Sequence, residues 1–440
     1  MELLIKKASL IDKEQGSLEV FDVLIGEGEI KEIGQDVLAP EATVIDAHDK
    51  VLVPGLVDVH VHFREPGQEY KEDLRTGSLA AAAGGFTTVI AEPNTIPPID
   101  TPTRLRRLLD ISDKRSVVHF YSKSAMTEGM MGHRLADIVK LREAGARAIS
   151  DDGNPVPSRR LMRNTLIKAK ESGILVSPHC EESALYRERI LRQHERRGQR
   201  SSRLQMPYAP PGAGPYTSEA GFIKRDIELA EKTEARIHIS HVSLARSVEI
   251  IADAKKRGVK VTAEATPHHL LLTERMAREI GPNAKANPPL RSEEDMLAVR
   301  EGLANGTIDI IASDHAPHSP EEKNRHWDQA PFGIIGLETT LGLILTHLVR
   351  PGILTLSQAI EKMTILPARI FGLDVLGVGT LRPGAKADLT LIDLDRKWKV
   401  DAGSFYSKGR NCPFDSWELH GKAILTIVAG RIVAKDGVVM

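Results

Sequence analysis

The sequence predicts an α/β fold: a (β/α)8 TIM-like barrel joined to a small composite β-sandwich built from the N- and C-terminal segments. Two observations lead to this prediction. In the middle of the chain, apolar runs such as TTVIAEPN, ARIHISHVS and IDIIASDHAP recur, and each is followed by a helix-like segment. A βα alternation repeated about eight times is typical of a closed parallel barrel, whose strands are apolar because both faces are buried. At the two ends of the chain, apolar and polar residues alternate instead.

The alternating segments lie at residues 1–53 and 372–440. Runs such as LLIKKASLI near the start and ADLTLIDLDRKWKV near the end have the period of two that a half-buried strand requires. Gly, Asp and Pro turns separate these runs. We therefore expect residues 1–53 to pair with 372–440 in the β-sandwich, and residues 54–371 to form the barrel.

The charge balance argues against partners that are bound through bulk charge. The chain has 440 residues, with 59 Lys and Arg against 60 Asp and Glu, and its net charge is −1. Nucleic-acid phosphates require a basic surplus or stripe, so we expect no nucleic-acid partner. The longest stretch without Asp, Glu, Lys or Arg, residues 76–91, is shorter than the about 20 residues that span a bilayer. With two cysteines and an N-terminus that is a poor signal peptide, the sequence predicts a soluble cytoplasmic protein without a membrane partner.

One segment, residues 187–215, interrupts the strand–helix alternation and is predicted to be an insertion. It is rich in arginine first and in proline and glycine later. Its seven arginines favour a solvated helix face followed by a loop, and an acidic partner is the alternative.

The candidate functional residues are the polar residues at the ends of the apolar runs, because the carboxyl ends of barrel strands carry the active site. In VDVHVHFREPG, His60 and His62 alternate and therefore point to one side of a strand. A lone histidine is more often a satisfied core residue, whereas two histidines at this spacing at a strand end indicate a metal site. Arg64 follows on the same face and places an anion-binding group beside the metal.

Later apolar runs end in the same kinds of residue. These residues are Asp151, Asp152, His179, His241 and Asp314. Burying each of them without a partner would cost several kcal/mol, and a metal centre removes that cost. Four histidines and two aspartates, with one taken from the adjacent pair, are more than one zinc ion needs, so we expect a two-metal site with one bridging carboxylate.

Two choices within this set stay open on the residues alone. Strand alternation puts Asp151 and Asp152 on opposite faces, so only one of them can bridge. His238 and His241 lie three residues apart at one strand end and compete in the same way. The sequence pattern does not choose within either pair.

The motifs resemble those of the dihydroorotase family, in its bacterial class I, which belongs with the cyclic amidohydrolases. The matching motifs are DVHVHFREPGQE, AEPNT, ISDDGNPV, PHCEE, HISHVS, VTAEATPHHLLLT, KANPPLR, ASDHAPH and APFGIIGLET. With the flanking strands, the resemblance covers nearly the whole chain. The combination of motifs is far more specific than any one of them.

The resemblance implies a role for each predicted metal ligand. The six ligands are His60, His62, Asp152, His179, His241 and Asp314. The first two would hold one zinc ion, His179 and His241 would hold the other, and Asp152 would bridge the two. Asp314 would also ligate the first zinc ion and act as the catalytic general acid and base.

The resemblance also implies a set of substrate contacts. The residues concerned are Arg64, Asn94, Asn287, His318, Phe332 and Gly333. Arg64, Asn94 and His318 would hold the carboxylate of the substrate. Asn287 would contact the pyrimidine ring, and the backbone of the last two residues would bind its polar edge.

The implied activity is the zinc-dependent, reversible cyclisation of N-carbamoyl-L-aspartate to (S)-dihydroorotate and water, the third step of de novo UMP (pyrimidine) biosynthesis. In the ring-opening direction a metal-bridged hydroxide would attack the ring carbonyl, and Asp314 would pass its proton to the leaving nitrogen. The cofactor would be two Zn2+ ions per subunit. A homodimer is expected from the frequency of such assemblies, and a complex with aspartate transcarbamoylase is left open.

Two other functions are alternatives. Related hydantoinases, dihydropyrimidinases and allantoinases bridge their metals with a carboxylated lysine on the strand where this chain has ARAISDDG, but positions 147–149 are Arg, Ala and Ile. This absence, with the carboxylate-binding set, disfavours a different cyclic-amide hydrolase. A non-catalytic barrel that supports aspartate transcarbamoylase would be expected to lose metal ligands, and this chain keeps all six.

The chain departs from the family pattern at two positions and has one unusually long loop. Glu65 stands where the family usually has Asp, and the binding of metal should tolerate this change, because Glu65 follows the ligands and is not one of them. Glu92 stands where Met is usual and adds a negative charge near an anion site. The polar segment 318–331 is long for a barrel loop and is predicted to be a mobile lid that excludes water during ring closure. Equal hydrogen-exchange protection of this segment with and without ligand would contradict the lid.

Overall fold

The computed structural model describes residues 2–12, 16–181 and 218–440. The predicted insertion at residues 187–215 lies outside the described residues. The chain forms two compact units. The first unit comprises residues 1–92, 107–122 and 309–440, and the second unit comprises residues 93–106 and 123–308.

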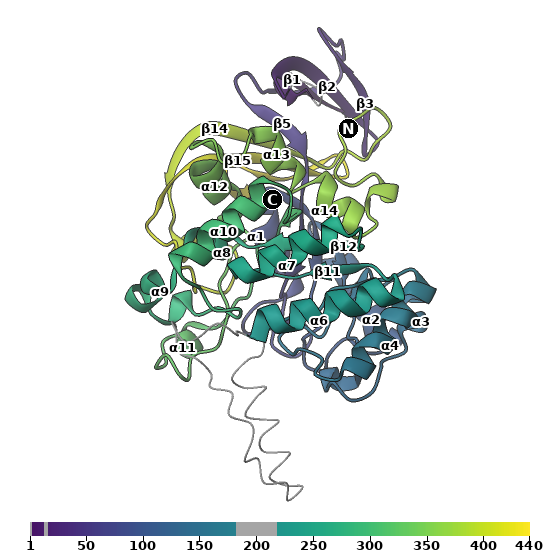
Figure 1. Ribbon diagram of the computed structural model, residues 1–440. Helices are drawn as coiled ribbons and strands as arrows, with labels where there is room; N and C mark the ends of the chain where they lie inside the picture. The colour runs from purple at the N-terminus through teal and green to yellow at the C-terminus, as the bar shows by residue number, and fades with distance from the viewer. Residues whose placement is uncertain (1, 13–15, 182–217) are drawn as a thin grey trace, which may run out of the picture. The chain divides into compact units, whose positions relative to one another are not determined.

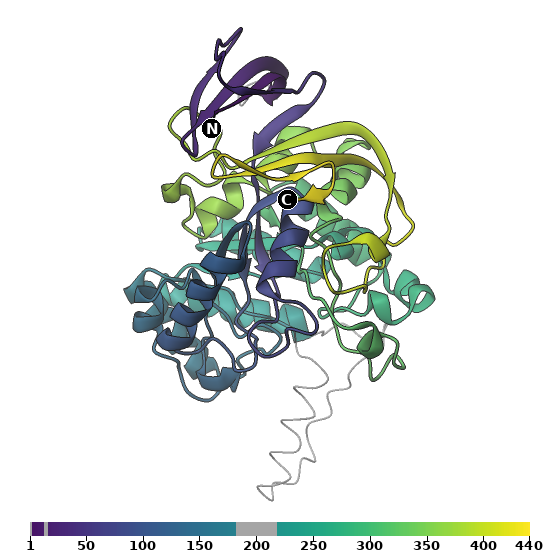
Figure 2. The ribbon, with the colours of Figure 1, turned by 180° about the vertical axis from the view of Figure 1, so that it is seen from behind.

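Both ends of the chain contribute strands to one nine-stranded sheet in the first unit (Figures 1 and 2). Its strands are β1 (Leu3–Ile11), β2 (Leu18–Gly26), β3 (Glu29–Gly34), β4 (Thr43–Asp46), β5 (Val51–Pro54), β14 (Leu389–Lys399), β15 (Glu418–Val428), β16 (Arg431–Lys435) and β17 (Val438–Val439). They follow the order β17-β16-β15-β14-β5-β1-β2-β3, and β4 pairs with β1. The two ends meet where β5 pairs antiparallel with β14, with Leu52 opposite Leu391.

The apolar side chains of this sheet come from both ends of the chain. Leu3, Ile5 and Ile25 belong to the same buried cluster as Leu391 and Ile427. Each of these side chains is almost completely removed from solvent. Burial of a side chain of this size contributes roughly 1.5–3 kcal/mol, so the cluster favours the pairing of the two terminal segments.

A parallel three-stranded sheet in the first unit begins the strand–helix repeats. β6 (Leu56–Val61) pairs with β7 (Phe86–Ala91), which pairs with β8 (His119–Ser122). Along the chain, α1 (Leu74–Ala83) follows β6 and α2 (Pro102–Arg115) follows β7. Asp73 caps the N-terminus of α1, and its carboxylate accepts the Thr76 N–H in a capping box. Gly77 allows α1 to approach the end of β6, since a Cβ there would lie 2.5 Å from the Phe63 ring.

The end of β6 lies beside the segment that follows β13 (Ile310–Ile311). Val61 and His315 form a parallel bridge, and the His62 N–H donates to the His315 carbonyl at 2.8 Å. This pairing brings the polar residues after β6 next to those after β13. The remaining short helices of this unit are α11 (Pro320–Lys323), α12 (Thr340–Ile344), η3 (Leu345–Val349), α13 (Leu356–Glu361), α14 (Ile365–Ile370), η4 (Asp374–Leu376) and η5 (Ala402–Ser404).

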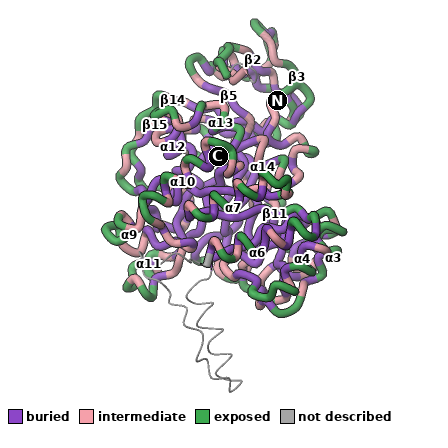
Figure 3. Tube along the Cα trace, in the orientation of Figure 1, coloured by how far each residue is buried: buried purple, intermediate pink, exposed green. Residues whose placement is uncertain are grey.

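The second unit repeats the alternation. Its strands β9 (Ala148–Ile149), β10 (Leu175–Val176), β11 (Ile237–Ile239) and β12 (Val261–Ala265) are neighbours in this order and pair in parallel. Its helices are η1 (Glu128–Met130), α3 (Ile138–Glu143), α4 (Arg159–Ser172), α6 (Ser218–Thr233), α7 (Ala245–Lys256), α8 (Pro267–Leu271), α9 (Glu274–Ile280), η2 (Pro282–Ala284) and α10 (Glu293–Ala304). α4, α6, α7 and α10 pack one beside the next. β11 is buried, whereas α3 and α4 carry exposed residues on their outer sides (Figure 3).

In both units the middle of the chain has parallel strands that alternate with helices, β6 to β8 in the first and β9 to β12 in the second, which confirms the α/β class. Several strands are only two residues long, for example β9 and β13. Polar residues follow within two positions of each of these strand ends. No helix within the described ranges has both the length and the apolar composition that crossing a membrane requires.

Candidate metal and substrate site

Two histidines and one aspartate converge in the first unit. His60 lies on β6 and His62 directly after it, so the alternation of the strand turns both rings to the same side. Asp314 follows β13, and its Oδ1 atom lies 3.6 Å from His60 Nε2 and 3.0 Å from His62 Nε2. All three side chains are buried.

A buried carboxylate, Asp58, fixes the two segments that carry this cluster. It accepts the backbone N–H of His60 at 3.0 Å and that of Ser313 at 3.1 Å. Because Ser313 directly precedes Asp314, these two hydrogen bonds tie β6 to the segment that carries the aspartate.

Glu92, directly after β7, adds a second carboxylate to the same cluster. Its Oε1 atom lies 3.6 Å from His60 Nε2, and both side chains are buried. The sequence analysis expected this negative charge near an anion site, and the structure places it beside His60. A negative charge beside imidazole nitrogens that face a metal ion is electrostatically favourable.

The donor set of the first unit suits a zinc ion. Two donor atoms at about 2.0–2.2 Å from one zinc ion in tetrahedral geometry lie roughly 3.3–3.6 Å apart. The nitrogen–oxygen distances of the cluster, 3.0 and 3.6 Å, are close to this range. His60, His62 and Asp314 form one of the groups of described residues that could hold a metal ion. Asp314 also has a φ of 47°, a strained conformation that is concentrated at functional sites.

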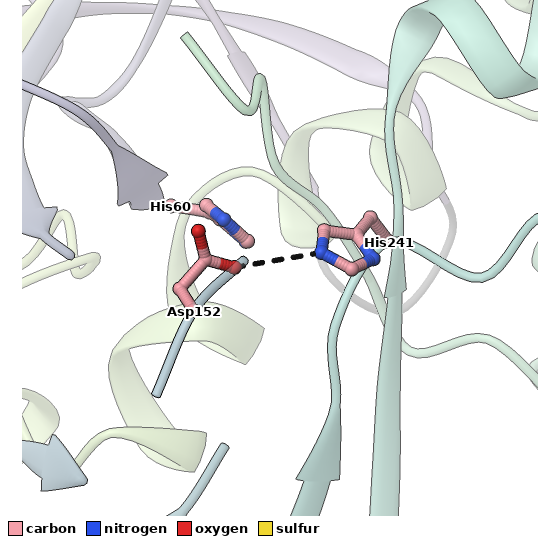
Figure 4. Close-up of side chains that lie close together, drawn as sticks. All are labelled: His60, Asp152 and His241. Carbon is pink, nitrogen blue, oxygen red and sulfur yellow. Dashed lines mark ion pairs between the residues drawn. The ribbon is translucent and has the colours of Figure 1, made fainter. Parts of the chain in front are cut away.

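A second cluster of the same chemistry lies in the second unit. Asp152 follows β9, His179 follows β10 and His241 follows β11. His179 Nδ1 lies 3.0 Å from His241 Nε2, and Asp152 Oδ1 lies 3.4 Å from the former and 3.6 Å from the latter. Figure 4 shows the ion pair of Asp152 and His241. All three side chains are buried, so this set has the donors and the spacing for a second metal ion.

The structure distinguishes the two aspartates that the sequence left open. Asp151 turns to the segment after β8, where its carboxylate accepts the N–H of Met126 at 2.8 Å and that of Thr127 at 3.1 Å, and also the Thr127 hydroxyl. Burial raises the pKa of Asp151 to about 7. Asp152, by contrast, faces His179 and is the aspartate that lies with the histidines.

The two histidines of HISH are distinguished in the same way. His238 lies on β11, with Nε2 3.0 Å from Glu264 Oε2 and Nδ1 2.9 Å from the Thr262 hydroxyl. Glu264 also accepts the backbone N–H of His241 at 3.3 Å. This buried carboxylate, which sequence reasoning missed, therefore orients the strand end where His241 adopts a φ of 33°.

Asn94 and Asn287 lie against the second cluster. The Asn94 amide donates to Asp152 Oδ2 at 3.0 Å, and Asn287 Nδ2 lies 2.9 Å from His179 Nε2. Asn94 was predicted to bind the substrate carboxylate and Asn287 to contact its ring. In the structure both amides lie beside candidate metal ligands.

In the first unit, basic side chains surround His318. Arg64 Nη2 lies 3.3 Å from His318 Nε2, and Arg64 Nε donates to the Pro317 carbonyl at 3.2 Å. Lys71 Nζ lies 3.3 Å from His318 Nδ1. The sequence analysis predicted that Arg64 and His318 act together, and the structure brings them together. The sequence analysis missed Lys71, which lies in a polar run without a distinctive motif.

Charged groups face both ring nitrogens of His318. Lys71 Nζ lies opposite Nδ1, whereas Arg64 Nη2 and the Phe332 carbonyl, the latter at 2.7 Å, lie opposite Nε2. Burial, and then the charges of Arg64, Lys71 and Lys323, hold the pKa of His318 far below its ordinary range. His318 is therefore neutral and lies beside the Arg64 guanidinium, a group that suits a carboxylate ligand.

A buried carboxyl group in the same unit gives the folded chain a pH dependence. Glu338 accepts the backbone N–H groups of Tyr406 and Ser407, both at 3.2 Å, and burial raises its pKa from 4.5 to about 8. The folded state then binds more protons than the unfolded state between pH 4.5 and about 8, so its stability should fall as the pH rises through this window. The expected slope approaches about 1.4 kcal/mol per pH unit at most.

Urea unfolding of wild type and Glu338→Gln across this pH window measures the effect. The variant, which cannot ionise, should lose the part of the slope that Glu338 contributes. Glu361→Gln, an exposed carboxyl at the end of α13, is the matched control and should keep the slope of the wild type. Equal slopes in wild type and Glu338→Gln would contradict the prediction.

Comparison with known proteins gives consistent results at the level of family, sequence and fold. The model of the amidohydrolase family matches residues 51–433. A dihydroorotase of Pelotomaculum thermopropionicum is 47% identical over 439 residues, covering 100% of both chains. A dihydroorotase of Geobacter metallireducens is 44% identical over 436 residues, covering 99% of this chain and 100% of the other. Among solved structures, an L-hydantoinase (dihydropyrimidinase) of Arthrobacter aurescens superimposes with a TM-score of 0.87 at 30% identity, covering 100% and 97% of the two chains.

Proposed function

This chain belongs to the amidohydrolase family, and we propose that it is a dihydroorotase, which reversibly cyclises N-carbamoyl-L-aspartate to (S)-dihydroorotate with release of water. The observation that carries this proposal is the pairing, within one unit, of the His60–His62–Asp314 cluster with the cationic pocket of Arg64 and His318. A cyclic amide with a carboxylate substituent needs both parts. The identity to dihydroorotases over the full length supports the same substrate.

For the fold, we propose that β6 to β13 close into the (β/α)8 barrel predicted for residues 54–371, beside a β-sandwich of residues 1–53 and 372–440. Two parallel bridges support this, Val61 with His315 and Ser124 with Ile149, because each extends the pairing of short strands beyond their ends. The likeness in fold to the L-hydantoinase supports the same architecture.

For the cofactor, we propose two Zn2+ ions per subunit, with Asp152 as the bridging carboxylate. His60, His62 and Asp314 would hold one ion, and His179 and His241 would hold the other, as the motifs imply. Bound zinc would polarise the ring carbonyl as a Lewis acid and lower the pKa of a water molecule. The imidazole and carboxylate donors within each cluster support this choice of metal.

The side chains of the chain would do the remaining work. In ring opening, the carboxylate of Asp314 accepts the proton of the attacking water and delivers it to the ring nitrogen as the C–N bond breaks. Arg64, Asn94 and His318 would bind the carboxylate of the substrate and fix its position. Asn287 would contact the pyrimidine ring, and the backbone of Phe332 and Gly333 would bind its polar edge.

The second candidate function is hydrolysis of hydantoin or a related cyclic amide. The likeness in fold to the L-hydantoinase favours it. It is the weaker candidate, because positions 147–149 are Arg, Ala and Ile and offer no lysine for a metal bridge. Hydantoin also has no carboxylate that the cationic pocket of Arg64 and His318 could bind.

Ring opening of L-dihydroorotate by the purified protein, with and without added zinc, tests the proposal, with hydantoin and allantoin as comparison substrates. Metal-dependent turnover of dihydroorotate alone is expected. Turnover of hydantoin instead would establish the second candidate. Absence of turnover by a protein that binds two zinc ions would point to a non-catalytic barrel that supports aspartate transcarbamoylase.

Arg64→Lys is expected to raise the KM for dihydroorotate by roughly tenfold to a hundredfold, with a smaller effect on kcat. Lysine keeps the charge but loses the fork of donors that bind a carboxylate in two places. Hydrogen bonds to charged groups contribute about 1.5–3 kcal/mol each, which gives this range. Steady-state kinetics measures the effect, and Arg246→Lys, on the exposed face of α7, should leave the KM unchanged. An unchanged KM in Arg64→Lys would contradict the role of Arg64.

We further propose that the protein is a cytoplasmic homodimer, and that aspartate transcarbamoylase is a candidate partner. The frequency of twofold assemblies among soluble enzymes supports the dimer. Cys180 and Cys412 are both free and buried, as in proteins of a reducing compartment. Light scattering of the protein alone and after mixing with aspartate transcarbamoylase tests both proposals.

A further inference from the structure

The connection between β14 and β15 packs against two segments that are distant in sequence: the start of α1 and the segment that follows β13. Ser407 Oγ donates to Glu72 Oε2 at 2.5 Å, and Lys408 Nζ donates to Asp73 Oδ2 at 2.6 Å. These contacts hold the connection against the start of α1. They leave Asn411, near the end of the connection, facing Ala316.

Asn411 joins two loops through four hydrogen bonds. Its amide nitrogen donates to the carbonyls of Ala316 at 3.0 Å and Gly333 at 2.9 Å, and its amide oxygen accepts the N–H of His318 at 3.2 Å. Its own backbone carbonyl accepts the N–H of Ile335 at 3.1 Å. The side chain is 1% exposed.

The pattern of partners fixes the orientation of this amide. Two carbonyl oxygens lie opposite the NH2 group, and a backbone N–H lies opposite the oxygen. Rotating the amide by half a turn would place oxygen against oxygen and donor against donor. Asparagine therefore fits this position, and aspartate, which has no donor, does not.

The loops that Asn411 joins are those of the candidate carboxylate pocket. The first loop carries His318 and the Pro317 carbonyl that receives the Arg64 guanidinium. The second contains the Phe332 carbonyl that receives His318 Nε2. The two loops are in close contact, since a Cβ on Gly333 would lie 2.5 Å from the Ala316 oxygen.

We propose that Asn411 is a positioning residue for substrate recognition: it holds the Ala316–His318 and Phe332–Gly333 loops at the separation that Arg64 and His318 need to bind the substrate carboxylate. This inference rests on the proposed function and extends it to a residue of the C-terminal segment. Asn411 acts on the pocket through the backbone of both loops.

Loss of the Asn411 side chain should affect binding of the substrate carboxylate and not the proton transfer by Asp314. Asp314 is held by contacts that do not involve Asn411, namely the Ser313 N–H to Asp58 and the His62 N–H to the His315 carbonyl. Loss of the Asn411 amide should therefore displace the carboxylate pocket and leave the Asp314 end of the loop in place.

Asn411→Ala is expected to raise the KM for dihydroorotate by roughly tenfold to a hundredfold, because displacement of a binding group by about 1 Å has effects of this size. The kcat should change by less than about threefold, which is the signature of lost ground-state binding. The dissociation constant of orotate, an unreactive ring with the same carboxylate, should rise by the same factor in calorimetry. Asn411→Ser, whose hydroxyl can replace one of the hydrogen bonds, should lie between wild type and Asn411→Ala, and it serves as the test variant if the alanine variant does not fold.

Thr426→Val is the matched control. It removes one buried hydrogen bond of the same unit, from the Thr426 hydroxyl to the Ala82 carbonyl, outside the pocket. It should lower the melting temperature and leave the KM and the orotate affinity unchanged. A wild-type KM in the Asn411 variants, or a fall in kcat without a change in KM, would overturn the inference. If the wild type itself does not turn over dihydroorotate, the proposed function fails, whereas an active wild type with unaffected Asn411 variants contradicts this inference alone.

Discussion

Replacing Asp314 by asparagine is expected to lower the kcat for dihydroorotate ring opening by roughly 10³-fold or more. The asparagine amide has nearly the shape of the carboxylate but cannot accept the proton of the attacking water, and a well-placed general base contributes about 10²–10⁴-fold. The loss of a negative charge 3.0 Å from His62 Nε2 should also weaken metal binding in the first unit.

Three measurements on Asp314→Asn separate these effects. Metal content after dialysis reports the lost ligand, kcat at saturating zinc reports the lost base, and the melting temperature reports the fold. Asp395→Asn, at an exposed position of β14, is the matched control and should behave as wild type in all three. An Asp314→Asn protein that keeps more than about a tenth of kcat with its metals bound would exclude Asp314 as the base.

The first cluster could be predicted because its residues obey local rules. The spacing of His60 and His62 fixes them on one face of a strand, whatever the rest of the fold does. Asp314 could be added because it ends another apolar run, and the carboxyl ends of parallel strands gather functional side chains. The structure brings these three residues together as predicted.

The choice between neighbouring residues could not be made from local rules. Asp151 and Asp152 have the same chemistry, and which one lies with the histidines is decided by the backbone N–H groups of Met126 and Thr127, which receive Asp151. Those groups lie on a different strand end. The resemblance to a family supplied the choice that periodicity did not.

The residues that the sequence analysis missed depend on contacts between distant segments. The sequence analysis noted the negative charge of Glu92 but missed its contact with His60. Asn411 has no motif or spacing around it, and its role follows from the pairing of two loops that precede it by many residues. The strands are also shorter than the apolar runs, since ARAISDDG contributes only Ala148–Ile149 as strand.

Replacing Asp152 by asparagine is expected to reduce the bound zinc from two ions per chain towards one and to lower kcat by roughly 10²-fold or more. A bridging carboxylate supplies the negative charge that allows two cations to lie close together, and an amide of the same shape supplies none. Within the second unit the change would also remove the charge that lies 3.4 Å from His179 Nδ1 and 3.6 Å from His241 Nε2. Elemental analysis after dialysis, together with kcat at saturating zinc, measures both effects.

The neighbouring residue provides the control, because Asp151→Asn changes the same functional group one position away. Asp151 bonds the backbone of Met126 and Thr127 instead of the histidines, so its loss should lower the melting temperature and leave two zinc ions bound. Stability loss in one variant and metal loss in the other would assign the bridge to Asp152. The reverse result, with metal lost from Asp151→Asn and retained by Asp152→Asn, would show that the bridging carboxylate is Asp151 and that the side chains rearrange when the metals bind.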